Sequence, residues 1–165
     1  LNEVNKDPIR FMMLNRSNDV ELDFDFDKVK EKTKDNPVFY VQYAFARINS
    51  LLRILNISFD DKIKLKEENF KLNENEEKIV RKIFEWPKVI ESASKNFELH
   101  KIPFYLYELS TLFHAYWSKG NEDKSFRFIE NDKIKRIEIL AILNLVSIVI
   151  QNGMKILGVS LPKKM

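Results

Sequence analysis

The sequence contains no cysteine, and only three glycines, five prolines and two histidines among its 165 residues. Without cysteine there is no disulfide and no thiolate ligand. Two histidines alone do not make a convincing zinc site, so we expect no metal in this chain. The scarcity of glycine and proline favours helices over many tight turns. Apolar residues are plentiful, at 44% with 13 phenylalanines. These values predict one folded domain with a hydrophobic core.

The charge is nearly balanced, with 28 basic and 25 acidic residues and a net charge of +3. This mild excess permits a polyanionic partner but does not require one, because a clustered patch matters more than the sum. The longest apolar run, residues 139–150, is interrupted by Asn144 and Ser147 and is shorter than the roughly 20 residues of a membrane-spanning helix. No signal peptide is visible. We therefore expect a cytoplasmic protein without a membrane partner.

The stretch 35–53 is typical of a long amphipathic helix with a marked start. Asn36 can cap its first turn, and Pro37 fits the first helical position. Apolar residues such as Val41 and Ile48 recur at helical spacing and predict a buried face.

Residues 1–17 show a second helical pattern. Asp7 can cap this helix and Pro8 can start it. Arg10 and Arg16 fall on its polar side.

Residues 20–27 alternate apolar with acidic side chains, which predicts a short extended segment with a solvated carboxylate face. A metal site is the alternative, but no further ligands lie nearby in the sequence. The highly charged run 28–34 then indicates a domain boundary near residue 35.

Two further helical patterns follow. The first covers residues 76–97, where Pro87 should kink or break the helix. The second opens at Pro103 and ends near Gly120.

The last long helix should be capped by Asp132 and run to about Asn152, with Gly153 as a left-handed stop. The whole pattern predicts an all-α fold, a helical bundle of four to five main helices preceded by a short connector.

The sequence carries no catalytic signature: there is no Gly-rich phosphate loop, no Gly-x-Ser-x-Gly and no pair of histidines on one helix. We interpret His100 and His114 as hydrogen-bonded structural residues, and Glu108 as one partner of a salt bridge to a neighbouring helix. An enzyme acting through Glu108 and His114 is the alternative. Those residues are six apart on one helix and should point in different directions.

Aromatic residues are interleaved with basic and amide residues in two of the predicted helices. Bases of single-stranded nucleic acid stack on rings while phosphates meet Lys and Arg, so this composition suits RNA, although core packing explains most of it. The residues are Tyr40, Gln42, Tyr43, Arg47, Arg53, Tyr116, Trp117 and Lys119.

Three stretches resemble the anticodon-binding domain of bacterial arginyl-tRNA synthetases. Residues 35–47 (Asp-Asn-Pro-Val-Phe-Tyr-Val-Gln-Tyr-Ala-Phe-Ala-Arg) resemble its start, residues 103–117 one of its helices, and residues 152–165 its terminus. The match runs through the chain in the right order. Two positions depart from the family pattern: Phe45 stands where the family has histidine, and Lys163 where it has glutamate.

The resemblance implies a class I ligase that attaches L-arginine to tRNA-Arg, with ATP converted to AMP and pyrophosphate in the presence of Mg²⁺. It implies that this chain carries the tRNA-binding part, with no catalytic residue, no cofactor of its own and no activity alone. Residues 1–34 would end the catalytic domain and form the connector, and residues 35–165 would form the anticodon-binding bundle. The expected partners are the anticodon stem-loop and the N-terminal catalytic part, in a monomer.

The resemblance also suggests roles for particular residues. Tyr116 and Met165 would lie against splayed anticodon bases, and Arg10 and Arg16 would lie near the inner stem. Trp117 is a further tRNA-binding candidate. Five residues would contact the tRNA backbone or brace the domain: Tyr40, Gln42, Tyr43, Arg47 and Arg53. Two alternatives remain open, a helical protein–protein interaction bundle without RNA binding and a different class I synthetase with the same type of domain.

Overall fold

The computed structural model describes residues 6–17, 36–57 and 71–165. Its helices are α1 (Lys6–Leu14), α3 (Pro37–Ile54), α4 (Glu74–Phe84), α5 (Trp86–Lys95), α6 (Lys101–Glu122) and α7 (Ile137–Leu157). Between α6 and α7 lie a 3₁₀ turn, η1 (Lys124–Phe126), and an antiparallel hairpin of β1 (Ile129–Glu130) and β2 (Lys133–Ile134). The predicted all-α bundle is confirmed.

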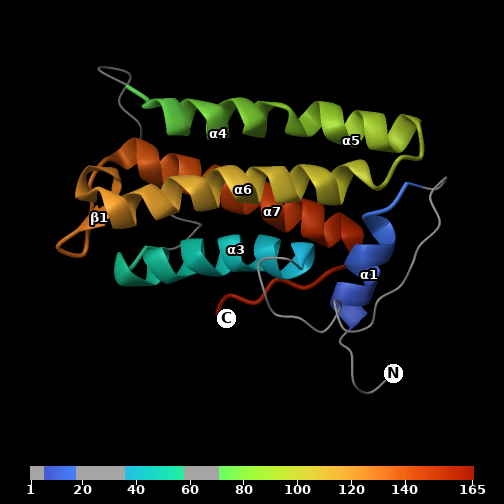
Figure 1. Ribbon diagram of the computed structural model, residues 1–165, viewed down its shortest axis with the longest axis horizontal. Helices are drawn as coiled ribbons and strands as arrows, with labels where there is room; N and C mark the ends of the chain where they lie inside the picture. The colour runs from blue at the N-terminus through green and yellow to red at the C-terminus, as the bar shows by residue number, and fades with distance from the viewer. Residues whose placement is uncertain (1–5, 18–35, 58–70) are drawn as a thin grey trace.

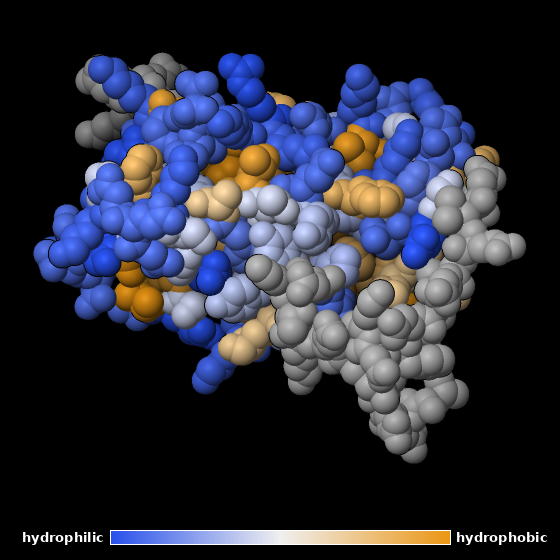
Figure 2. All heavy atoms as spheres, in the orientation of Figure 1, coloured by the Kyte–Doolittle hydropathy of each residue, from blue (hydrophilic) through white to orange (hydrophobic). Residues whose placement is uncertain are grey.

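The helices form three layers (Figure 1). Helices α4 and α5 lie end to end along one side, α6 and α7 lie in the middle, and α3 lies along the other side. Helix α6 contacts α3, α4, α5 and α7, so it is the centre of the bundle. The core has fully buried side chains from all three layers, including Val41, Ile79, Leu106, Phe113 and Ile150. Figure 2 shows the molecule from the same side as Figure 1, and this face is largely hydrophilic with scattered apolar groups.

Helix α3 begins and packs as predicted. Pro37 opens it after the N-cap residue Asn36, although the Asn36 side chain makes no cap hydrogen bond. Val41 and Ile48 have no exposed surface. Phe45, which stands where the resemblance expects histidine, is 3% exposed and belongs to the hydrophobic core.

The predicted break at Pro87 is also confirmed. Helices α4 and α5 meet at Glu85, which is the last cap of one and the first cap of the other, and Pro87 lies in the first turn of α5. Proline has no N–H with which to continue the hydrogen bonds of α4. Helix α4 itself begins with a capping box, in which Asn73 and Glu76 each accept a hydrogen bond from the other's backbone N–H.

Both predicted ends of the last helix are wrong. Asp132 lies in the hairpin turn with φ 56°, and α7 begins at Ile137. Gly153 does not stop the helix. A Cβ at Gly153 would lie 2.7 Å from Leu106 Cδ2, so the glycine lets α6 and α7 approach closely. The helix ends instead at Gly158, whose φ of 65° is the left-handed conformation of a helix stop.

Helix α1 begins one residue before Asp7, which therefore lies inside the helix instead of capping it. The Asp7 carboxylate accepts hydrogen bonds from the backbone N–H and the hydroxyl of Ser160. Arg10 Nε donates to the carbonyl of Leu157. Helix α1 is thus fastened to the end of α7 and to the segment that follows it.

Some predictions concern residues at or beyond the edge of the described structure. The alternating segment 20–27 and the charged run 28–34 lie outside the described residues. Within residues 1–34 the structure describes α1, whose Phe11 has no exposed surface and packs in the bundle core. A domain boundary near residue 35 stays a prediction.

Helix α7 extends well beyond the apolar run 139–150. By length and composition its 21 residues could cross a membrane, so the length of that run does not settle the question. More than half of its apolar window is buried inside the bundle, where it contacts α3, α4 and α6. This is the position of a core helix.

Candidate nucleic-acid interface

A pocket of about 560 Å³ opens between α3, the end of α6, the segment from η1 to β1, and the last residues of the chain. Its lining combines aromatic rings, apolar side chains and cations, and no Asp or Glu is among the lining residues that the structure describes. The lining residues are Tyr43, Ala46, Arg47, Ser50, Leu51, Arg53, Ile54, Trp117, Gly120, Asn121, Phe126, Arg127, Phe128, Ile129, Lys164 and Met165.

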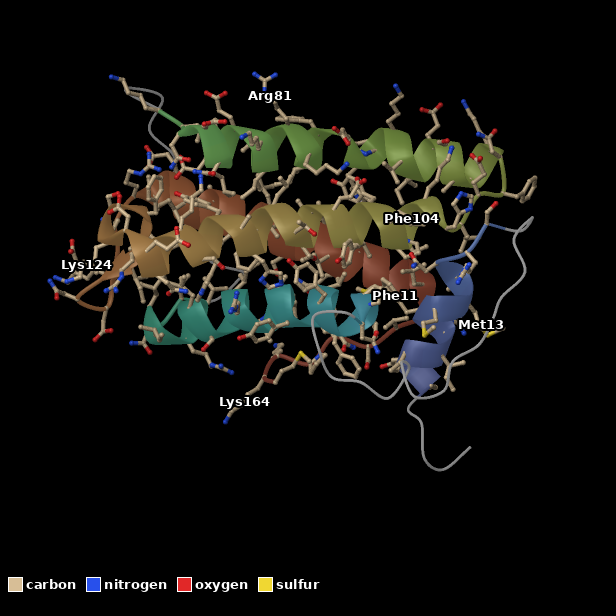
Figure 3. The ribbon with its side chains drawn as sticks, viewed as in Figure 1. Phe11, Met13, Arg81, Phe104, Lys124 and Lys164 are labelled. Atoms are coloured by element: carbon tan, nitrogen blue, oxygen red, sulfur yellow. The ribbon has the colours of Figure 1, made fainter. Side chains whose placement is uncertain are left out.

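Four cations line this pocket: Arg47, Arg53, Arg127 and Lys164. Because no Asp or Glu is among the described residues that line the pocket, its side chains carry net positive charge and should attract negative charge. Lys164 extends outward from the last segment of the chain beside α3 (Figure 3).

The C-terminal segment after Gly158 forms one wall of the pocket, and α3 holds it there through side-chain hydrogen bonds. Gln42 Nε2 donates to the carbonyl of Ser160 at 2.9 Å, and Arg53 Nη1 donates to the carbonyl of Lys163 at 3.3 Å. The contact to Lys163 uses its backbone, so lysine in place of the family's glutamate does not disturb it. Met165, which is 53% exposed, is thereby brought to the pocket.

Arg47 is the cation most enclosed by aromatic rings. Its guanidinium carbon lies 4.3 Å from the centre of the Tyr43 ring and 5.2 Å from the Trp117 ring. Such contacts attract a cation to the ring faces. Arg47 Nη1 also lies 3.1 Å from His114 Nδ1. Three groups, the Tyr43 and Trp117 rings and the His114 imidazole, therefore hold the guanidinium in the lining of the pocket.

His114 is 6% exposed and lies between α6 and α3. Its Nε2 is 3.1 Å from the carbonyl oxygen of Tyr40. A carbonyl only accepts and a guanidinium only donates, so Nε2 carries the proton and Nδ1 accepts from Arg47. Burial lowers the pKa of His114 to about 4, and the neighbouring Arg47 charge lowers it further, against the opposing hydrogen bond to Tyr40. The imidazole is neutral near pH 7.

Tyr116 is not at the pocket. Its side chain is 3% exposed, and its hydroxyl donates to Glu76 Oε1 at 2.7 Å and accepts from Asn73 Nδ2 at 3.0 Å. Arg136 also pairs with the fully buried Glu76 carboxylate. Burial, followed by the hydrogen bond to Glu76, raises the pKa of Tyr116 to about 12. A stacking ring needs an exposed face, so this placement argues against Tyr116 as a base-stacking residue.

The structure separates the remaining predicted residues into groups. Tyr43, Arg47, Arg53, Trp117 and Met165 meet at the pocket. Tyr40 and Gln42 do not line the pocket but contact residues that support it. The Tyr40 ring lies 4.4 Å from the His114 ring between centres, and Gln42, which is 5% exposed, donates to the carbonyl of Ser160. Arg10 and Arg16 lie on α1 and in the turn after it, both exposed and away from the pocket lining.

The sequence reasoning missed the wall formed by Phe126, Arg127 and Phe128. Arg127 Nε donates to the carbonyl of Gly120 at 3.0 Å, which joins this wall to the end of α6. Phe128 is buried and meets the Trp117 ring edge-on at 5.5 Å. The same interleaving of aromatic and basic residues that drew attention to Tyr43 and Arg47 was available here as a signal.

The predicted salt bridge of Glu108 is confirmed. Its Oε2 lies 2.6 Å from Lys82 Nζ, across the contact between α6 and α4. Glu108 and His114 have different partners, and among the described residues no hydrogen bond joins them into one site.

A protein-family model, the DALR anticodon binding domain, matches residues 41–165. The chain belongs to this family. Every residue that lines the pocket falls within the matched part of the DALR domain.

The DALR chain is similar to the last part of curated arginine–tRNA ligases. The ligase of Pelagibacter ubique is 54% identical over 163 residues, which cover 99% of this chain and 28% of the relative. The ligase of Brucella ovis is 44% identical over 171 residues, which cover 100% of this chain and 29% of the relative. The chain thus spans less than a third of the length of the curated relatives it matches.

Solved structures resemble the DALR chain as well. An arginyl-tRNA synthetase structure from Campylobacter jejuni superposes with a TM-score of 0.82 at 26% identity, covering 99% of this chain and 34% of that chain. The arginyl-tRNA synthetase of Thermus thermophilus gives a TM-score of 0.72 at 20% identity, covering 96% of this chain and 26% of that chain. At 20% identity the second likeness supports the fold alone.

Proposed function

We propose that this DALR domain is the tRNA-binding part of an arginine–tRNA ligase, and that its pocket receives one unpaired base of the anticodon loop of tRNA-Arg. The observation that carries the proposal is the lining itself. It offers aromatic and apolar surface for a base and four cationic side chains for the flanking phosphates, and no Asp or Glu is among its described residues.

Trp117 takes the stacking role that the resemblance suggests for Tyr116. It is half-buried and lines the pocket, whereas the neighbouring Tyr116 ring is buried against Glu76. Met165 supplies apolar contact from the C-terminal segment. Arg53 and Lys164 line the pocket and are exposed, so they are available to meet the backbone phosphates. Gln42 braces the C-terminal segment and does not touch RNA.

The whole protein would ligate L-arginine to tRNA-Arg, with ATP converted to AMP and pyrophosphate and with Mg²⁺ as the metal. The support is the similarity to curated ligases of which this chain matches less than a third. No residue described here is assigned to ATP or Mg²⁺. Catalysis would belong to the N-terminal catalytic part of the same polypeptide, which is the expected partner of this domain besides tRNA. We place the protein in the cytoplasm as a monomer. The family match disfavours the rival interaction bundle without RNA binding.

The test is a titration of the full 165-residue chain with a fluorescent tRNA-Arg anticodon stem-loop at two salt concentrations. Trp117→Ala should weaken binding by about 1–3 kcal/mol, the value of one stacked base. Arg53→Ala should weaken binding and reduce the slope of affinity against salt by about 0.7, since one phosphate contact is lost.

Matched controls are available on the same chain. Arg81, on α4, is an exposed arginine far from the C-terminal segment (Figure 3), so Arg81→Ala removes the same charge elsewhere. Met13 is 58% exposed against 53% for Met165, so Met13→Ala is the control for Met165→Ala. Equal losses in pocket and control variants, or undetectable binding by the folded wild type, would contradict the proposal.

A further inference from the structure

We infer that His114 is a positioning residue of the pocket: it holds the Arg47 guanidinium in a fixed orientation for RNA without neutralising its charge. This inference rests on the proposed function of the pocket and assigns a specific task to one buried side chain of α6.

Arg47 needs such a partner because a free arginine side chain is mobile. Its rotamer freedom is lost when a ligand fixes a flexible arginine, and this loss opposes binding. The usual partner is a carboxylate. In the described part of the chain no Asp or Glu forms a salt bridge with Arg47, and none lines the pocket.

A neutral imidazole can fix an arginine side chain in a different way from a carboxylate. It accepts one N–H of the guanidinium through Nδ1 and contributes no negative charge. Arg47 keeps its full charge, and its other N–H groups remain for a phosphate or for the acceptor edge of a base. The Tyr43 ring at 4.3 Å supports one side of the guanidinium plane.

The imidazole is itself fixed from two sides. The Tyr40 carbonyl, at 3.1 Å from Nε2, selects the tautomer whose Nδ1 accepts. The ring lies 4.4 Å from the Tyr40 ring and 5.6 Å from the Tyr43 ring, the latter at an interplanar angle of 26°. Residues three or four apart share a helix face, and two such rows face each other here. The row on α3 is Tyr40, Tyr43 and Arg47, and the row on α6 is His114 and Trp117.

Two conservative substitutions each keep one of the two hydrogen bonds of His114 and remove the other. His114→Gln places its amide near the position of Nε2 and can still reach the Tyr40 carbonyl, but it leaves no acceptor at Nδ1. His114→Asn places an amide oxygen near the position of Nδ1 and can still accept from Arg47. A purely structural histidine would respond to the two changes according to fold stability alone.

The experiment combines a double-mutant cycle with NMR of the free protein. In the stem-loop titration we expect His114→Gln to bind about 3- to 10-fold more weakly than wild type, the range of one lost hydrogen bond, and His114→Asn to bind more tightly than His114→Gln. In an Arg47→Ala background, His114→Gln should cause no further loss of affinity. In ¹⁵N spectra, the Arg47 guanidinium should show hindered rotation in wild type and His114→Asn, and free rotation in His114→Gln.

These readouts separate the two proposals. Absence of RNA binding by wild type, with a hindered Arg47, would reject the proposed function and leave the held arginine standing. An additive loss from His114→Gln in the Arg47→Ala background, or a freely rotating Arg47 in wild type, would overturn the inference whatever the RNA result. If thermal unfolding shows that His114→Gln is unfolded, the comparison of His114→Asn with wild type decides the matter, and a freely rotating Arg47 in that variant counts against it.

Discussion

Protonation of His114 should destabilise the fold between pH 6.5 and pH 4. The native state buries the neutral imidazole against Arg47 and the Tyr40 carbonyl, and the pKa of His114 falls from its ordinary value of 6.5 to about 4. In the unfolded chain the same ring takes up a proton near pH 6.5. The unfolded state therefore binds more protons than the native state in this interval, and the free energy of unfolding must decrease as the pH falls.

The magnitude follows from the two pKa values. Their difference of about 2.5 units corresponds to about 3 kcal/mol, at 1.36 kcal/mol per unit. No discount for solvent is needed, because His114 is only 6% exposed. The full contribution is present above pH 6.5 and is lost by about pH 4. Arg47 is the charged group that faces the ring, and it keeps its charge throughout this range.

The assay is urea unfolding at half-unit steps from pH 4 to pH 7.5, for wild type and for His114→Gln. Carboxylates titrate in both proteins, so their contribution cancels in the difference. We expect the stability difference between the two proteins to shrink by about 3 kcal/mol, or to reverse in sign, as the pH falls from 6.5 to 4. Parallel curves would refute the reasoning, since they would mean that His114 has the same pKa folded and unfolded.

Two more substitutions test other parts of the structure. Tyr116→Phe removes the hydroxyl that hydrogen-bonds to both Glu76 and Asn73. The free energy of unfolding in urea should fall by about 1.5–3 kcal/mol, while the affinity for the stem-loop stays unchanged. Weaker RNA binding at unchanged stability would indicate that Tyr116 contacts the RNA. Gly158→Ala should cost about 1–2 kcal/mol of thermal stability, because the residue has φ 65° and its Cβ would lie 2.9 Å from Arg10 Nε; an unchanged melting temperature would contradict the left-handed helix stop.

The sequence was a good guide wherever one local signal decided the structure. The start of α3 at Pro37 and the break at Pro87 follow from the missing N–H of proline, and the buried face of α3 follows from its apolar spacing. The meeting of Arg47 with Trp117 was partly predictable, because both were chosen as candidates. No local pattern could predict that they meet in one pocket, because they are 70 residues apart in the sequence.

The errors come from contacts between distant parts of the chain. Tyr116 and Trp117 are neighbours on α6, and which of the two faces the pocket was decided by Glu76, 40 residues earlier. Gly153 was interpreted as a local stop signal, whereas its role is to accommodate Leu106 on another helix. Neither partner is visible in the periodicity of a single helix.

The attachment of the C-terminal segment constrains how this chain can change during evolution. Arg10, Gln42 and Arg53 all donate to backbone carbonyls, at Leu157, Ser160 and Lys163. Because every residue has a carbonyl, these three hydrogen bonds do not depend on the side chains at the accepting positions, as the lysine at 163 illustrates. Insertions and deletions are different, since each one would displace the last residue by about 3.3 Å and break the register of the donors. For these hydrogen bonds the length of the segment therefore matters more than the identity of the accepting residues.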